Sequence, residues 1–278
     1  NCSHQIKLMV LRRPLESANV PPAGLEAAGE ACRFSQRAVP VVAAYNAFPA
    51  NRPVDEGFAN WTSFAETLDR FSRCFGAEPA VFGYLWKLNW LDLWWPRDRW
   101  VGDLLRARPG LAGYISQNNP NSPSLRQALA YFAVSRALAS ELTVAEARRA
   151  WFEGLFPTTA GRVRDIFARI DDDFASGPPV AGRADRNFTK VYARATFADA
   201  VDQVAELRRD VSGERERALL ERLQAELALN LAAYDIFSDD TPDCRLAPDK
   251  RAMVSDMVWL DFWSRVCSRG VDQAGSGR

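Results

Sequence analysis

Four short apolar runs occur in the first 120 residues, and no run of this kind follows them. Each has the length of a strand and is mostly apolar without alternation, the pattern of strands buried on both faces of a parallel sheet. Amphipathic stretches separate the second run from the third and the third from the fourth. This order predicts an α/β fold. The predicted strands are Ile6–Arg12, Val39–Tyr45, Ala80–Trp86 and Leu111–Ser116.

Two helices are predicted between these strands. The first places Trp61, Phe64, Leu68 and Phe71 on one face, with Asn60 as its N-cap. The second spans Arg97–Arg108.

After residue 121 the sequence reads as helices alone, so we expect a partial (β/α)8-type barrel over residues 1–120, a helical domain over 121–272 and a disordered tail over 273–278. A capping box over Thr143–Glu146 marks one helix start. Other expected starts and breaks are Ser122-Pro123, Thr159, a Gly/Pro linker over Ser176–Arg186, Thr196, Ser212-Gly213, a helix over Glu214–Phe237 and a last helix over Asp249–Cys267.

The charge balance argues against two classes of partner. The chain has 35 basic and 35 acidic residues, and no region has a marked excess of positive or negative charge. Binding to nucleic acid or to an anionic membrane needs a surface with an excess of positive charge, so we expect neither partner. No apolar run reaches the length of a membrane helix, and no signal-peptide pattern opens the chain. Oligomeric state and compartment stay open.

Histidine is the scarcest chemical group in the chain. His4 is the only one, which excludes Ser-His-Asp and Cys-His catalysis and histidine-rich metal sites within the chain. The five cysteines form no C-x-x-C pair, although a Cys244–Cys267 bridge stays open. Glycine-rich nucleotide motifs are missing. We therefore expect no cofactor and no metal, and either carboxylate chemistry or binding without chemistry.

A tryptophan-rich segment follows the third predicted strand and contains five tryptophans between Trp86 and Trp100. Flat rings with a polar edge suit the C–H faces of a sugar, and neighbouring amides can bind its hydroxyls. Trp94 and Trp95 are expected to pack instead. A second amide cluster follows the fourth strand. The predicted carbohydrate-binding residues are Tyr84, Trp86, Asn89, Trp90, Gln117 and Asn118.

Candidate catalytic acids are scarce. Glycoside hydrolysis usually needs two carboxylates, and Asp92 is the one credible candidate near the predicted site. Asp98 and Asp103 fall in the following helix, where we expect solvated acids. The run Asp171-Asp172-Asp173 is expected to be a solvated helix end rather than a metal cluster, because adjacent helical residues point in different directions.

The order of features resembles a known family. Val20-Pro21-Pro22, Val81–Tyr84, Gly110–Gln117 and Trp151-Phe152 are similar, over roughly residues 5–175, to the C-terminal part of the bacterial domain-of-unknown-function 4838 family. That resemblance implies a relative of α-glucuronidases and hexosaminidase-type glycoside hydrolases, with a (β/α)8 barrel and a helical C-terminal domain. Many relatives carry an acid beside the third-strand tyrosine, and this chain does not. We therefore expect a fragment, with any general acid upstream of Asn1.

Three functions stay open: a glycoside hydrolase relative acting on polysaccharide, a non-catalytic carbohydrate-binding protein, and a helical structural or interaction protein. The first two depend on one spatial condition. The indoles around residue 90 and the amides near residue 118 must share the rim where neighbouring parallel strands end. Aromatic side chains sealed under the helices would favour the third.

Overall fold

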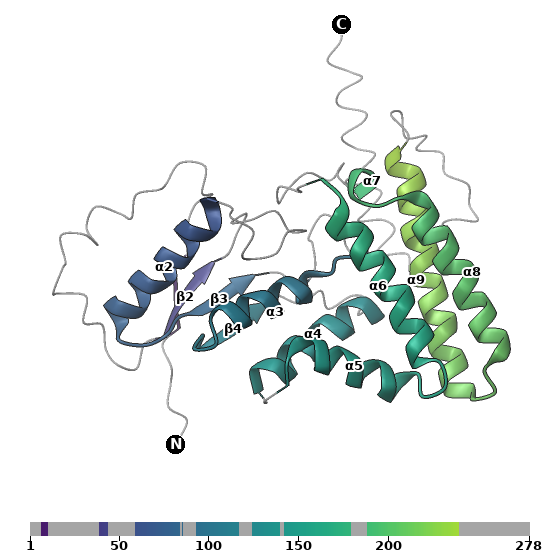
Figure 1. The fold of residues 1–278 in the computed structure, drawn as a ribbon, viewed down its shortest axis with the longest axis horizontal. Helices are drawn as coiled ribbons and strands as arrows, with labels where there is room; N and C mark the ends of the chain where they lie inside the picture. Colours follow the sequence, from purple (N-terminus) through teal and green to yellow (C-terminus); the bar gives the residue numbers. More distant parts are fainter. Residues whose placement is uncertain are drawn as a thin grey trace, which may run out of the picture.

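The computed structural model describes residues 7–10, 39–43, 59–83, 85, 93–116, 124–139, 142–178 and 188–238. A small sheet and its helices form one part of the molecule and a group of helices forms the other (Figure 1). The strands are β1 (Lys7–Val10), β2 (Val39–Ala43), β3 (Ala80–Gly83) and β4 (Gly113–Ser116), and the helices are α2 (Ala59–Phe75), α3 (Arg97–Ala107), α4 (Leu125–Ala139), α5 (Val144–Leu155), α6 (Ala160–Ser176), α7 (Phe188–Val191), α8 (Arg194–Asp210) and α9 (Glu214–Ser238).

The strands form one parallel sheet in the order β1-β2-β3-β4. Each predicted strand contains one observed strand, so the α/β prediction for this half of the chain is confirmed. Val41, Val42, Ala80 and Val81 are buried, which explains why these runs are continuously apolar. The described strands form a row and do not close into a barrel.

Helix α2 connects β2 to β3 and buries Phe64 and Leu68, as its spacing predicts. It ends at Gly76, whose φ of 64° suits a residue without a Cβ. Asn60 was wrongly predicted as the N-cap of this helix. The helix begins one residue earlier, at Ala59, so Asn60 lies inside its first turn.

Helix α3 connects β3 to β4 and buries Trp100, Val101 and Leu104. These side chains pack with Val81 of β3 and with residues of α4. This sheet-side core therefore includes a helix from the second half of the chain. Its buried members are Val42, Phe64, Leu68, Val81, Leu85, Trp100, Val101, Leu104, Ala130 and Val134.

The second half of the described chain is all-helical, as predicted. Helices α8 and α9 run side by side (Figure 1) and are joined by the predicted break at Ser212-Gly213. Leu125 and Leu129 of α4 enter the core of this half, whereas Ala130 and Val134 of the same helix enter the sheet-side core. Helix α4 thus contributes to both cores. None of the described helices combines the length and apolar character needed to cross a bilayer.

Helix starts were predicted with mixed success. The capping box at α5 is confirmed: Thr143 Oγ1 accepts from Glu146 N at 3.2 Å, and Thr143 N donates to Glu146 Oε2 at 2.7 Å. Thr159 is the N-cap residue of α6, as predicted, but its side chain makes no capping bond and its hydroxyl donates to Glu216 of α9 at 2.7 Å. Thr196 was also wrong as a start, since α8 begins at Arg194.

Several predictions concern residues outside those described. They are the Ser122-Pro123 start, most of the Ser176–Arg186 linker, the Asp249–Cys267 helix, the tail over 273–278, His4 and the Cys244–Cys267 pair. For α4 itself, Ser124 receives a hydrogen bond on Oγ from Gln127 N at 3.1 Å and so caps the helix directly before Leu125.

Candidate functional site

Strands β3 and β4 are parallel neighbours, and their last residues, Gly83 and Ser116, are register partners. Both strands therefore end at one edge of the sheet, which we call the carboxyl edge. Leu85 N donates to Ser116 Oγ at 3.0 Å, a bond that links the chain leaving β3 to the end of β4. In α/β proteins this edge is where ligands bind.

The predicted carbohydrate-binding residues Tyr84, Trp86, Asn89, Trp90, Gln117 and Asn118 and the candidate acid Asp92 all lie outside the described residues. Their segments nevertheless begin at the carboxyl edge, because Tyr84 is bonded to Gly83 and Gln117 to Ser116. The structure thus shows that the two strands end at one edge, and it does not test where the indoles and amides lie. The side-chain roles stay predictions.

Trp94 and Trp95 pack in the helical core, as predicted. Trp94 is 1% exposed, and its ring meets Phe167 edge-on at 4.5 Å between centroids. Trp95 meets Phe174 in the same manner at 5.4 Å. The Trp94 backbone is also fixed, since its N–H donates to Asn230 Oδ1 at 2.7 Å and its carbonyl accepts from the Tyr192 hydroxyl at 3.0 Å. These indoles stabilise the fold and do not form a sugar platform.

Asp98 was wrongly predicted to be a solvated acid. Instead of lying in solvent, it is fully buried at the start of α3. Its Oδ1 accepts from Arg126 of α4, and its Oδ2 accepts from Arg148 Nη1 of α5 at 2.7 Å. The partners lie 28 and 50 residues away, so no local pattern announces them.

Asp171 is a second correction, since it is 1% exposed inside α6. Its Oδ2 accepts from Arg148 Nη2 at 2.6 Å and its Oδ1 from Trp94 Nε1 at 2.7 Å. Asp172 is exposed and pairs with Arg99 at 2.8 Å. The three side chains of the aspartate run diverge, and the described residues hold no group of three acids, histidines or cysteines able to bind a metal.

Asp98, Arg126, Asp171 and Arg148 form a closed cycle of alternating charge, the buried charge ring. Arg126 completes it with an ion pair from Nε to Asp171 Oδ1 at 3.8 Å. Two carboxylates and two guanidinium groups balance, so the ring brings no net charge into the interior. One residue comes from each of α3, α4, α6 and α5, and the ring therefore joins four helices.

Electrostatics keep two members of this ring, Asp98 and Arg148, ionised. Burial on its own raises the pKa of Asp98, but the charges and hydrogen bonds of Arg126 and Arg148 outweigh burial and lower it to about 2. Burial also opposes the charge of Arg148, but Asp98 and Asp171 raise the pKa of Arg148 above its usual value. A carboxyl group with so low a pKa does not hold a proton near neutral pH, so Asp98 is excluded as a general acid.

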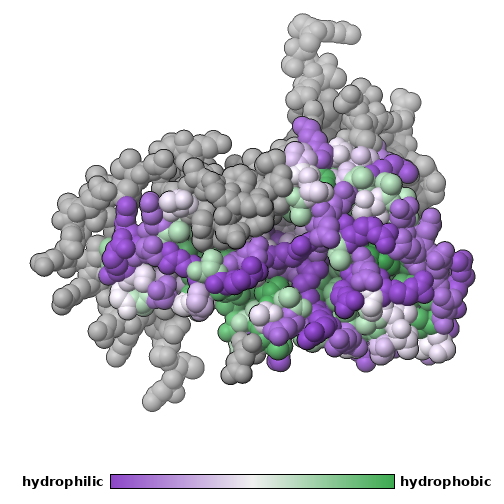
Figure 2. All heavy atoms as spheres, viewed as in Figure 1, coloured by the Kyte–Doolittle hydropathy of each residue, from purple (hydrophilic) through white to green (hydrophobic). Residues whose placement is uncertain are grey.

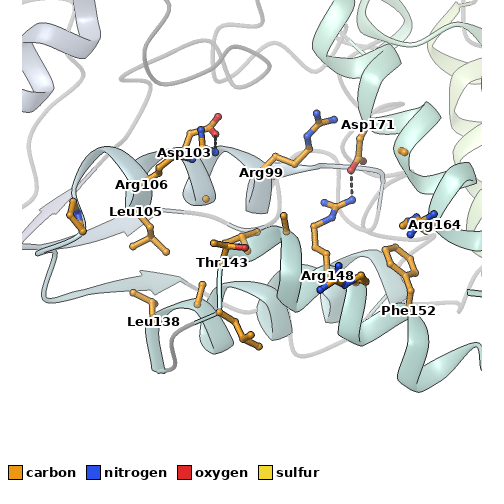
Figure 3. Close-up of a pocket in the computed structure, with 18 of the residues that line it drawn as sticks. Arg99, Asp103, Leu105, Arg106, Leu138, Thr143, Arg148, Phe152, Arg164 and Asp171 are labelled. Atoms are coloured by element: carbon orange, nitrogen blue, oxygen red, sulfur yellow. Dashed lines mark hydrogen bonds and ion pairs between the residues drawn. The ribbon is translucent and has the colours of Figure 1, made fainter. Parts of the chain in front are cut away.

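An open groove of about 1300 Å³ lies beside the ring (Figure 3). Apolar residues gather between α3 and the pair α4 and α5 on this face (Figure 2), where Leu105 and Leu138 line the groove. Its acidic side chains are ion-paired, with Arg106 on Asp103 at 2.7 Å, Arg148 on Asp171 and Arg99 on Asp172. Asp103 is thus half-buried and ion-paired, and the groove holds no pair of unengaged carboxylates among its described residues.

A buried arginine and a partly buried tyrosine at the carboxyl edge were missed by the sequence analysis. Tyr114 of β4 reaches across to Gly83, where an added Cβ would collide with the phenol oxygen. Arg97, the first residue of α3, lies beside Tyr114, and its guanidinium carbon stacks 3.9 Å from the centre of the Trp100 ring. Burial lowers the pKa of Arg97 and raises that of Tyr114 to about 12. The only local signal was the three-residue spacing of Arg97 and Trp100 on one helix face.

A scan against protein-family models, a search of curated proteins and a search of solved structures found no match for this chain.

Proposed function

We propose that the chain is part of a carbohydrate-active protein related to barrel-type glycoside hydrolases. The observation that supports it best is the parallel pairing of β3 and β4, because the tryptophan-rich and amide-rich segments then start from one edge of the sheet. Loops that follow parallel strands are the usual place for a ligand site in such folds.

In this proposal the aromatic rings of Tyr84, Trp86 and Trp90 stack on the sugar. Asn89, Gln117 and Asn118 bind its hydroxyl groups. The four strands would belong to a (β/α)8-type barrel, and the helical half would pack against it as in the family that the sequence resembles.

Catalysis is the less supported part of the proposal. Asp98 and Asp171 are engaged in the buried charge ring, and Asp103 is paired with Arg106. Asp92 is therefore the one acid of the predicted site that could act, and hydrolysis by two carboxylates needs a second acid from elsewhere. Binding without chemistry is the alternative within the same proposal.

The test is carbohydrate binding by titration calorimetry with uronic-acid and hexosamine oligosaccharides. Trp86→Ala and Trp90→Ala should each weaken binding about tenfold, because each removes a stacking ring. Leu138→Ala is a matched control, since Leu138 is an exposed apolar residue of α4 and belongs to neither of the two predicted binding segments. Unchanged affinity in both tryptophan variants, or no binding of any oligosaccharide, would contradict the proposal. Assay of the same glycosides for cleavage separates hydrolysis from binding.

A second candidate, a helical structural or interaction protein, is favoured by the burial of Trp94 and Trp95 beneath the helices. Under this alternative the tryptophan-rich segment as a whole serves packing. Trp86→Ala and Trp90→Ala would then lower the melting temperature with no sugar affinity to lose.

A further inference from the structure

Arg97 is a buried cation without an acidic partner in the part of the chain that the structure describes. Arg97 is only 8% exposed, and its Nη1 has no hydrogen-bond partner. Burial lowers the pKa of Arg97 and Tyr114 raises it, and no described carboxylate contributes to the shift. A buried charge of this kind is costly unless a counter-charge accompanies it.

Two other arginines near α3, one buried and one partly buried, do have acidic partners. Arg126 and Arg148 both reach Asp98 and Asp171 in the buried charge ring. Arg97 lies next to Asp98 in the chain, but Asp98 is directed at those two arginines instead. The fold therefore neutralises these two guanidinium groups internally and leaves the third without a counter-ion among the described residues.

Arg97 and Tyr114 are neighbours, and each has a buried donor without an acceptor among the described residues. The guanidinium stacks on Trp100 through its flat face, which leaves the in-plane N–H groups to other partners. Tyr114 Oη is also buried and lies within hydrogen-bonding reach of Arg97, which lowers the pKa of Tyr114 against the effect of burial, but its own O–H finds no acceptor among the described residues. Two neighbouring groups thus offer donors and lack an acceptor.

Arg97 and Tyr114 lie at the carboxyl edge of the sheet, where ligands bind in α/β proteins. Tyr114 Oη packs against Gly83, the last residue of β3, and Arg97 opens the helix that follows this strand. Both are at the carboxyl edge, and a glycine at position 83 is what makes room for the hydroxyl.

We propose that Arg97 and Tyr114 form a binding site for a small monoanionic ligand that carries a carboxylate. A planar carboxylate can accept from the edge of the guanidinium and from the phenol together. One positive charge matches one carboxylate, whereas a phosphate dianion would leave negative charge uncompensated. This site does not depend on the carbohydrate proposal, since it uses none of the residues named there.

The experiment is thermal unfolding of the whole chain in acetate, in chloride at equal ionic strength, and in phosphate. Acetate should raise the melting temperature saturably, by about 3 °C at a tenfold excess over its Kd. An equal rise in chloride, a larger saturable rise in phosphate, or no rise in acetate would each overturn the proposal. These titrations use the unaltered protein and need no variant to fold.

Substitutions of Arg97 and Tyr114 test whether acetate binds at these two residues. Arg97→Met should abolish the acetate-dependent rise while the protein without acetate keeps or gains stability, because an uncompensated charge has been replaced by an apolar chain. Tyr114→Phe keeps the cation and should weaken acetate binding several-fold. Arg106→Met removes an exposed arginine of the same helix and should behave as the wild type. Retention of the full acetate effect in Arg97→Met would refute the assignment even if the wild-type titration succeeds.

Discussion

Arg148 Nη2 donates to Asp171 Oδ2 at 2.6 Å, and this bond joins α5 to α6. The same guanidinium donates through Nη1 to Asp98 Oδ2 at 2.7 Å and so reaches α3 as well. A single planar fork therefore holds two buried carboxylates that would otherwise repel each other.

Replacement of Arg148 by Ala should destabilise the protein strongly. Asp98 and Asp171 would stay buried with only Arg126 between them, and a broken buried pair of this kind costs about 3–5 kcal/mol. Urea denaturation measures the loss of unfolding free energy. Arg149→Ala is the matched control, because Arg149 is the exposed neighbour on α5. Equal stability of the two variants would show that the ring contributes nothing.

Acid should weaken the protein through Asp98. Its pKa is lowered from 3.8 to about 2, so its contribution to stability is present above pH 3.8 and is lost as the pH falls toward 2. The size of that contribution is about 2 kcal/mol. The measurement is unfolding free energy against pH for the wild type and Asp98→Asn. We expect the variant to have a shallower slope between pH 4 and 2; identical slopes would mean that folding does not lower the pKa of Asp98.

Trp94→Phe tests the polar end of a buried indole. Phenylalanine keeps most of the apolar packing but removes the Nε1 donor to Asp171, which should cost about 1–3 kcal/mol. Trp151→Phe is the comparison, because Trp151 is buried in the same core and its indole donates to no described residue. If both variants lose the same stability, the hydrogen bond to Asp171 has no measurable role.

Gly83→Ala tests the close approach of β4 to β3. The new Cβ would collide with the Tyr114 hydroxyl, and overpacking of this kind costs about 1–3 kcal/mol. In a Tyr114→Phe background the colliding oxygen is gone, so the same substitution should cost less. A double-mutant cycle measures the coupling. Additive effects would argue that the strain lies elsewhere.

The sequence predicted the sheet well because its strands depend on local apolar runs. Val41, Val42, Ala80 and Val81 are buried where the pattern says they should be. The capping box at Thr143 was equally predictable, since both of its partners lie within four residues.

Long-range contacts defeated the same approach elsewhere. The hydroxyl of Thr159 turns to Glu216, 57 residues away, rather than to its own helix. Asp98 and Asp171 are charged residues whose burial depends on arginines from other helices, and burial of a charge is improbable until its partner is known. Arg97 was missed because its significance lies in the lack of such a partner among the described residues.

Helix α4 has consequences for how the chain can be divided. Leu125 and Leu129 belong to one core, and Ala130 and Val134 to the other. A polypeptide that stops after residue 120 would present the bare sides of α3 and the sheet to water, and it would also lose Arg126 and Arg148, the counter-ions of Asp98. Such a truncated product should aggregate, so the two halves of this chain are best produced and studied as one piece.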